Sequence, residues 1–117
     1  MARIPPEAHA APFYVVTYDN RGSNVFRRST GIYELDMDRM TRAGLVADVQ
    51  AWQFDNIARI YECHPGESCT DITADIASEV MLAELGDNGF LPDYMIDWLE
   101  DVLGCRAVAD ARREYAA

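Results

Sequence analysis

Between Ile60 and Cys105 the chain carries eleven acidic side chains and neither lysine nor arginine. They are Glu62, Glu67, Asp71, Asp75, Glu79, Glu84, Asp87, Asp93, Asp97, Glu100 and Asp101. If so one-sided a segment folds, it projects a negative field that attracts cations and basic protein surfaces and repels nucleic acid. The segment therefore has to combine a solvated acidic surface with a buried apolar one.

Two predicted helices meet this requirement. The first begins near residues 70–73 and ends at Gly86, with the apolar stripe Ile72, Ile76, Val80, Leu82 or Met81, and Leu85. The second opens at Leu91-Pro92 and stops at Gly104, with the stripe Met95, Trp98, Leu99, Val102 and Leu103. Trp98, like Trp52 on an earlier stripe, is therefore predicted to lie in the core.

Acidic residues recur every fourth position on both predicted helices. Asp71, Asp75 and Glu79 do so on the first, and Asp93, Asp97 and Asp101 on the second. Four residues of α-helix rise about 6 Å and return to the same face. Like charges at that spacing destabilise a helix by roughly 0.2–0.5 kcal/mol per pair. Because no nearby lysine or arginine relieves this repulsion, the pattern favours a use for the two rows.

The remaining elements indicate an α+β fold. Residues 13–19 and 24–30 predict a β-hairpin around the turn at 20–23, and residues 57–63 predict a third strand before a loop at 64–67. Helical patterns start at residue 36 or 38 and run to 53, and again cover about 106–115. The predicted order is ββαβααα, a small antiparallel sheet packed against three to four helices.

Length and charge set further limits. The 117 residues suit one domain over 13–117, preceded by a flexible arm over 1–12. The net charge is −10, with residues 1–42 at +1 and residues 43–117 at −11, which argues against direct binding of nucleic acid or anionic membranes. No apolar run suits a signal peptide or a membrane span, and three cysteines without an export signal indicate the cytoplasm.

The acidic rows suggest mimicry of a nucleic-acid backbone. A DNA strand carries one charge per ~3.4 Å, within a factor of two of the carboxylate spacing. In size, acidity and lack of a catalytic set, the chain resembles anti-CRISPR and anti-restriction proteins. That resemblance implies a non-enzymatic inhibitor that binds a basic partner surface, such as that of a nucleic-acid-binding complex. The predicted partner-binding residues are Asp71, Asp75, Glu79, Glu84, Asp87, Asp93, Asp97, Glu100 and Asp101.

Two other readings of the acids stay open. The first alternative is a small housekeeping or regulatory domain that self-associates, for example as a homodimer, and whose acids serve only solubility. The acidic surface is alternatively neutralised within the molecule by Arg106, Arg112 and Arg113.

Metal binding and catalysis have little support. Cys63, His64 and Cys69, with distant Cys105, do not match the closely spaced cysteine pairs of zinc sites, and a Cys63–Cys69 disulfide is not expected in a reducing compartment. The two histidines, His9 and His64, belong to no catalytic or phosphate-binding motif. We therefore expect no enzymatic activity, no metal and no cofactor.

Overall fold

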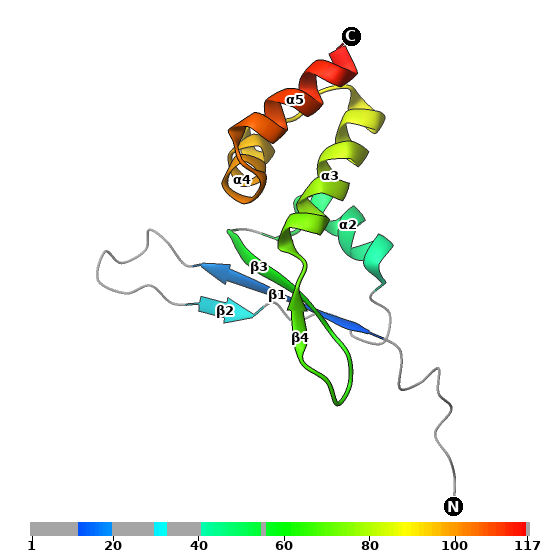
Figure 1. Cartoon of the computed structure of the whole chain (residues 1–117), viewed down its shortest axis with the longest axis vertical. Coiled ribbons are helices and arrows are strands. Elements are labelled where there is room, and N and C mark those ends of the chain that lie inside the picture. The colour runs from blue at the N-terminus through cyan, green and yellow to red at the C-terminus, as the bar shows by residue number, and fades with distance from the viewer. Residues whose placement is uncertain (1–11, 20–29, 33–40, 55, 117) are drawn as a thin grey trace, which may run out of the picture. The chain divides into compact units, whose positions relative to one another are not determined.

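A computed structural model describes residues 12–19, 30–32, 41–54 and 56–116. Contacts divide the chain into two compact units: a sheet unit of residues 1–42 and 56–72, and a helical unit of residues 43–55 and 73–117. The described elements run β1, β2, α2, β3, β4, α3, α4, α5 (Figure 1). The α+β class is confirmed, with one short strand more than expected. Residues 1–11 of the predicted arm lie outside the described residues, and a single domain over 13–117 stays a prediction.

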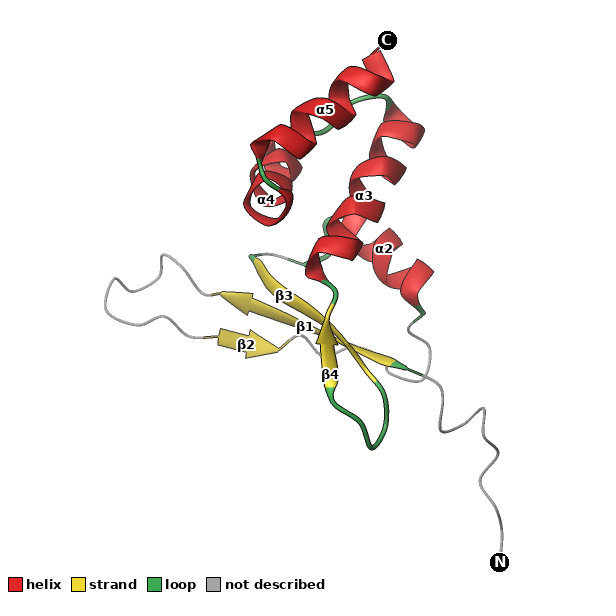
Figure 2. Cartoon of the chain, viewed as in Figure 1, coloured by secondary structure: helices red, strands yellow, loops and turns green. Residues whose placement is uncertain are grey.

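The sheet unit is built on an antiparallel sheet of order β2-β1-β3-β4 (Figure 2). Its strands are β1 (Phe13–Asp19), β2 (Thr30–Ile32), β3 (Ile57–Cys63) and β4 (Cys69–Asp71). Aromatic and β-branched residues dominate β1, and these side chains suit a pleated surface. Tyr14 and Val16 are buried two positions apart, as the alternation of a strand requires.

Strand β4 is the element that the sequence did not predict. It pairs with β3 in the register Tyr61↔Asp71 and Cys63↔Cys69, and the Ile72 N–H donates to the Ile60 carbonyl at 2.9 Å. The tight turn through residues 65–66 lies within the expected loop and brings the chain back along β3. Thr70 and Asp71, which were predicted to lie at the start of a helix, are therefore extended, together with Cys69. Of the predicted return strand at 24–30, only Thr30 is described, and it begins β2.

The helical unit contains most of α2 (Arg42–Gln50) together with α3 (Thr73–Asn88), α4 (Asp93–Leu103) and α5 (Cys105–Ala116). Helices α3, α4 and α5 pack against one another. Among the described residues, the largest fully buried side chains of this unit are Leu45, Val49, Thr73, Ile76, Val80, Met95, Leu99 and Val108. The predicted stripe of α4 is confirmed at Met95, Trp98 and Leu99, whereas Val102 and Leu103 are only half-buried.

Two glycines set the ends of α3 and α4. The prediction that the first acidic helix ends at Gly86 is wrong, because α3 continues to Asn88. Gly89 ends it instead at φ +78°, where a left-handed backbone is open to glycine, and its N–H donates to the Leu85 carbonyl at 2.9 Å. Gly104, at φ +92°, separates α4 from α5 as predicted.

Candidate functional site

Charge is distributed very unequally between the two units. The helical unit contains twelve acids and three arginines, a net charge of −9, whereas the sheet unit contains eight acids and seven arginines, a net charge of −1. Nearly all of the excess negative charge of the chain therefore belongs to one compact unit. Net charge of this size in so small a body produces a strong local potential.

Helix α4 carries the clearest row of carboxylates. Asp93, Asp97 and Asp101 are all exposed, and the opposite face of the helix buries Met95 and Leu99. At a rise of 1.5 Å per residue, the three carboxylates follow one another at about 6 Å along the helix. The predicted row on this helix is therefore present, with its apolar stripe turned to the core.

The predicted row on α3 is shorter than expected. Asp75 and Glu79 are exposed on this helix, with Asp75 in its first turn, where the positive end of the helix dipole favours an acid. Asp71 does not continue this row, because it lies on β4 in the sheet unit. Its Oδ2 atom lies 3.6 Å from Nη1 of Arg59. Strand pairing with β3 thus overrides the spacing of four that placed Asp71 on a helix.

Glu84 is buried and hydrogen bonded within the helical unit. It is only 6% exposed and accepts hydrogen bonds from Gln50 Nε2 at 3.1 Å and Asn88 Nδ2 at 2.6 Å. Gln50 also donates to Asp87 Oδ2 at 2.8 Å, although Asp87 itself stays exposed. Glu84 therefore does not offer a free carboxylate to a partner. A signal was present in the sequence, since Glu84 follows Val80 by four residues and so shares the buried face of α3.

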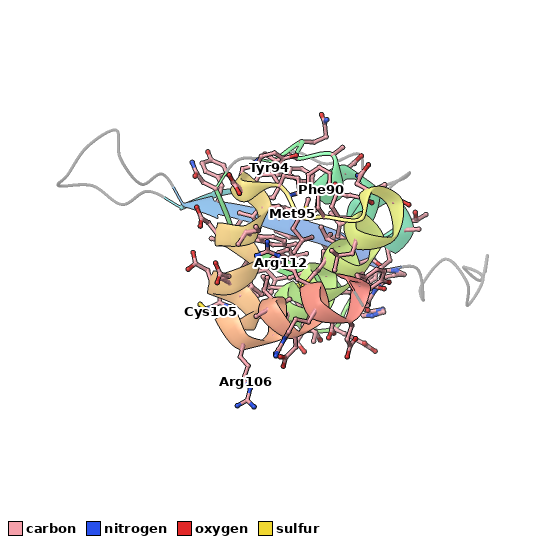
Figure 3. The ribbon with its side chains drawn as sticks, turned by 90° about the horizontal axis from the view of Figure 1, so that it is seen from above. Phe90, Tyr94, Met95, Cys105, Arg106 and Arg112 are labelled. Carbon is pink, nitrogen blue, oxygen red and sulfur yellow. A yellow bond between two sulfur atoms is a disulfide. The ribbon has the colours of Figure 1, made fainter. Side chains whose placement is uncertain are left out.

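The arginines of α5 neutralise little of the acidic surface. Arg113 pairs with Asp110 on the same helix. Arg106 projects away from the helices (Figure 3), and within the described part of the chain neither it nor Arg112 forms an ion pair. The described carboxylates of α4 consequently have no arginine from α5 as an ion-pair partner.

Glu100 is half-buried and acts on the neighbouring thiol. The Cys105 thiol is exposed, and a side-chain hydrogen bond to the Glu100 carboxylate, followed by the negative charge of that carboxylate, raises the pKa of Cys105. A thiol with a raised pKa is a poorer nucleophile at neutral pH. This pair therefore does not resemble an activated cysteine.

Cys63 and Cys69 form a disulfide across the paired strands β3 and β4. The expectation of two reduced thiols is wrong for this structure, because the hairpin brings the two Cα atoms to 4.1 Å. The bond removes the thiolates that a Cys63, His64 and Cys69 metal site requires. Among the residues that the structure describes, no three histidine, cysteine or acidic side chains gather to hold a metal ion. His64 instead lies 3.2 Å from Glu62, measured between Nε2 and Oε1.

An aromatic cluster in the helical unit was not predicted as a feature of the surface. The ring of Trp52 lies 5.1 Å from that of Tyr94 and 6.1 Å from that of Trp98, measured between centroids. Trp98 is buried as predicted, and its Nε1 has no hydrogen-bond partner in the described structure. Trp52 is half-buried and Tyr94 is exposed, so the cluster extends from the core to the surface.

The backbone at Trp52 is unusual. Its φ is +57°, its N–H donates to the Val49 carbonyl at 2.9 Å, and the Gln53 N–H donates to the Asp48 carbonyl at 3.0 Å. These two bonds make a Schellman motif at the end of α2, in which glycine usually occupies the left-handed position. A side chain there costs about 1–2 kcal/mol. The ring contacts of Trp52 offset this cost.

Comparison of the chain with protein-family models, curated proteins and solved structures finds no match in any of the three. In the described part of the chain, no helix combines the length and the apolar character needed to cross a membrane.

Proposed function

We propose that the protein is a non-enzymatic inhibitor that works by protein–protein contact. Its acidic helical unit covers an arginine- and lysine-rich surface of a partner and excludes the nucleic acid that this surface would bind. The observation that carries the proposal is the exposed row Asp93, Asp97 and Asp101, on a unit with a net charge of −9.

The contact set follows from the unit to which each acid belongs and from its burial, and it keeps the half-buried Glu100. Asp71 and Glu84 leave the set, because one lies on the sheet unit near Arg59 and the other is buried and hydrogen bonded. The remaining residues are Asp75, Glu79, Asp87, Asp93, Asp97, Glu100 and Asp101. They present carboxylates at intervals that a cationic channel accommodates in place of phosphates, and the displaced counterions favour the complex.

This function requires no catalytic group, metal or cofactor. It is the mode of action that the resemblance to anti-CRISPR and anti-restriction proteins implies, and it excludes direct binding to nucleic acid or membrane. Binding depends on charge and therefore weakens as salt is added.

The test is a pull-down from the source cell with the full chain as bait, followed by competition with DNA. The variant Asp93→Asn, Asp97→Asn, Asp101→Asn removes three charges from α4. The matched control Asp48→Asn, Glu67→Gln, Glu114→Gln removes three charges outside the contact set. We expect DNA to displace the captured partner, the α4 variant to lose it, and the control to keep it. Equal capture by both variants would eliminate the proposal.

Self-association with acids that serve only solubility is the competing function. Light scattering at low and high salt separates the two. A protein that remains monomeric in both conditions, and loses its partner when α4 is neutralised, fits the inhibitor. A stable dimer whose formation ignores the α4 charges fits the alternative.

The proposal also places the protein in the cytoplasm, where disulfides are usually reduced. Alkylation of thiols in intact source cells, followed by mass spectrometry, reports the state of Cys63 and Cys69 at the site of action. Alkylated cysteines support the cytoplasm, whereas a fully oxidised pair contradicts it.

A further inference from the structure

Two large aromatic side chains of the helical unit are exposed beside its carboxylates. Phe90, in the connection between α3 and α4, is 64% exposed, and Tyr94, in the first turn of α4, is 54% exposed. In Figure 3 both lie toward the side of this unit away from Arg106. Aromatic residues are enriched in the centres of protein–protein contacts.

Acidic residues lie close to these two aromatic residues in the sequence. Asp93 and Asp97 are exposed on the same helix as Tyr94, and Tyr94 and Asp97 are three residues apart, a spacing that puts them on one helical face. No lysine or arginine occurs between Arg59 and Arg106 to compete for these groups. We call Phe90, Asp93, Tyr94 and Asp97 the aromatic–acidic patch.

The Tyr94 ring of the patch is supported by aromatic side chains that lead into the core. Tyr94 packs on Trp52, and Trp52 packs on the buried Trp98. The end of α2 accepts a left-handed backbone at Trp52 while keeping this ring in the cluster. A side chain that is already ordered loses little conformational entropy on binding, so Tyr94 is suited to anchor a partner.

The combination of aromatic faces and carboxylates matches one side chain best. A guanidinium group is planar and stacks on aromatic rings, and its fork of N–H groups donates two parallel hydrogen bonds to a carboxylate. The lysine ammonium is more strongly hydrated and lacks the fork. Charge complementarity selects a basic protein surface as the occupant, and the exposed rings favour one that is rich in arginine.

We infer that the aromatic–acidic patch is the centre of the partner contact and that it binds arginine side chains of the partner, stacked on Tyr94 and Phe90 and paired with Asp93 and Asp97. The inference rests on the proposed function and assigns the chemistry of its partner. The carboxylates attract any cation and also pair with the guanidinium fork, whereas stacking on the rings supplies most of the preference for arginine over lysine.

The test uses two fluorescein-labelled peptides of equal length and charge as probes, one with nine arginines and one with nine lysines, and measures binding to the full chain by fluorescence anisotropy. We expect the arginine peptide to bind about 5- to 10-fold more tightly than the lysine peptide, as one or two stacked guanidinium groups would produce. Phe90→Ala with Tyr94→Ala removes most of this preference and leaves lysine binding unchanged. Asp93→Asn with Asp97→Asn weakens the binding of both peptides.

The control replaces two exposed apolar side chains elsewhere, Leu82→Ala with Tyr115→Ala, at 46% and 49% exposure. It should bind both peptides like the parent chain. Circular dichroism verifies the helices of each variant, and the single substitution Phe90→Ser tests the patch without touching the Trp52 cluster if Tyr94→Ala impairs folding.

The inference is overturned if the parent chain binds both peptides equally, if it binds neither, or if the control loses the preference for arginine as fully as the patch variant. Equal binding that still disappears with Asp93→Asn and Asp97→Asn removes the role of the rings but leaves the proposed function standing. A preference for arginine that coincides with an unchanged pull-down by the α4 variant overturns the proposed function instead.

Discussion

The left-handed backbone of Trp52 predicts that Trp52→Ala and Trp52→Gly differ in their free energy of unfolding. Trp52→Ala removes the ring contacts with Tyr94 and Trp98, each worth about 0.5–1.5 kcal/mol, and leaves a Cβ atom in the unfavourable conformation. Trp52→Gly removes the same contacts but frees the backbone. Both variants are therefore expected to be less stable than the parent chain by about 1–3 kcal/mol.

The difference between the two variants carries the test. Because glycine accepts the left-handed conformation, Trp52→Gly avoids a cost of about 1–2 kcal/mol in the folded state. The larger conformational entropy of glycine in the unfolded chain lowers the stability of this variant by about 0.4–1 kcal/mol. Trp52→Gly should thus be more stable than Trp52→Ala by about 0.5–1 kcal/mol. Urea unfolding followed by the helical circular dichroism signal measures this difference, provided that the slope of the transition is unchanged.

A matched control should show the opposite effect, with glycine less stable than alanine. Ala109 is exposed within α5, where glycine should cost about 1 kcal/mol relative to alanine. If Trp52→Ala equals or exceeds Trp52→Gly in stability while Ala109→Gly is destabilised, the assignment of a strained Schellman position at Trp52 is refuted.

Three further outcomes are expected. Glu84→Ala removes the acceptor of the Asn88 amide and one of the two acceptors of the Gln50 amide, and it should lower the free energy of unfolding by about 1–3 kcal/mol, measured by urea titration; an unchanged value would contradict its structural role. Because Glu100 raises the pKa of Cys105, the thiolate forms at higher pH than in a free cysteine, so iodoacetamide should react slowly at pH 8 and faster in Glu100→Gln; equal rates would exclude the interaction. Reduction of the disulfide, whose cysteines are separated by 6 positions, should destabilise the sheet unit by about 2 kcal/mol in a denaturant series run with and without reductant, whereas Cys63→Ser with Cys69→Ser should show no response to reductant.

Local patterns were sufficient for most of the fold. Aromatic and β-branched residues predicted β1, alternation predicted β3, and the apolar stripe of Met95, Trp98 and Leu99 predicted the buried face of α4. These features depend on neighbours in the sequence. The row of Asp93, Asp97 and Asp101 was predictable for the same reason, since it lies opposite that stripe.

The errors arose where a distant segment decides the outcome. A spacing of four placed Asp71 on a helix, but pairing with Tyr61 of β3 makes it part of a strand. Glu84 counted as one more surface acid although its spacing from Val80 places it on the buried face of α3, because the amide of Gln50 that satisfies the buried carboxylate comes from a different helix. The contact of Trp52 with Tyr94 likewise joins segments separated by some forty residues, and spacing along the chain carries no sign of it.

The path of the chain between its two units limits how the protein can be dissected. The helical unit consists of two stretches of sequence: residues 43–55, which precede β3, and residues 73–117, which follow β4. A fragment that starts at Thr73 keeps every acid of α3 and α4, yet it discards the indole behind Tyr94 and the amide that holds Glu84. Grafting the acidic surface onto another scaffold would consequently require a circularly permuted or two-piece design rather than a simple C-terminal excision.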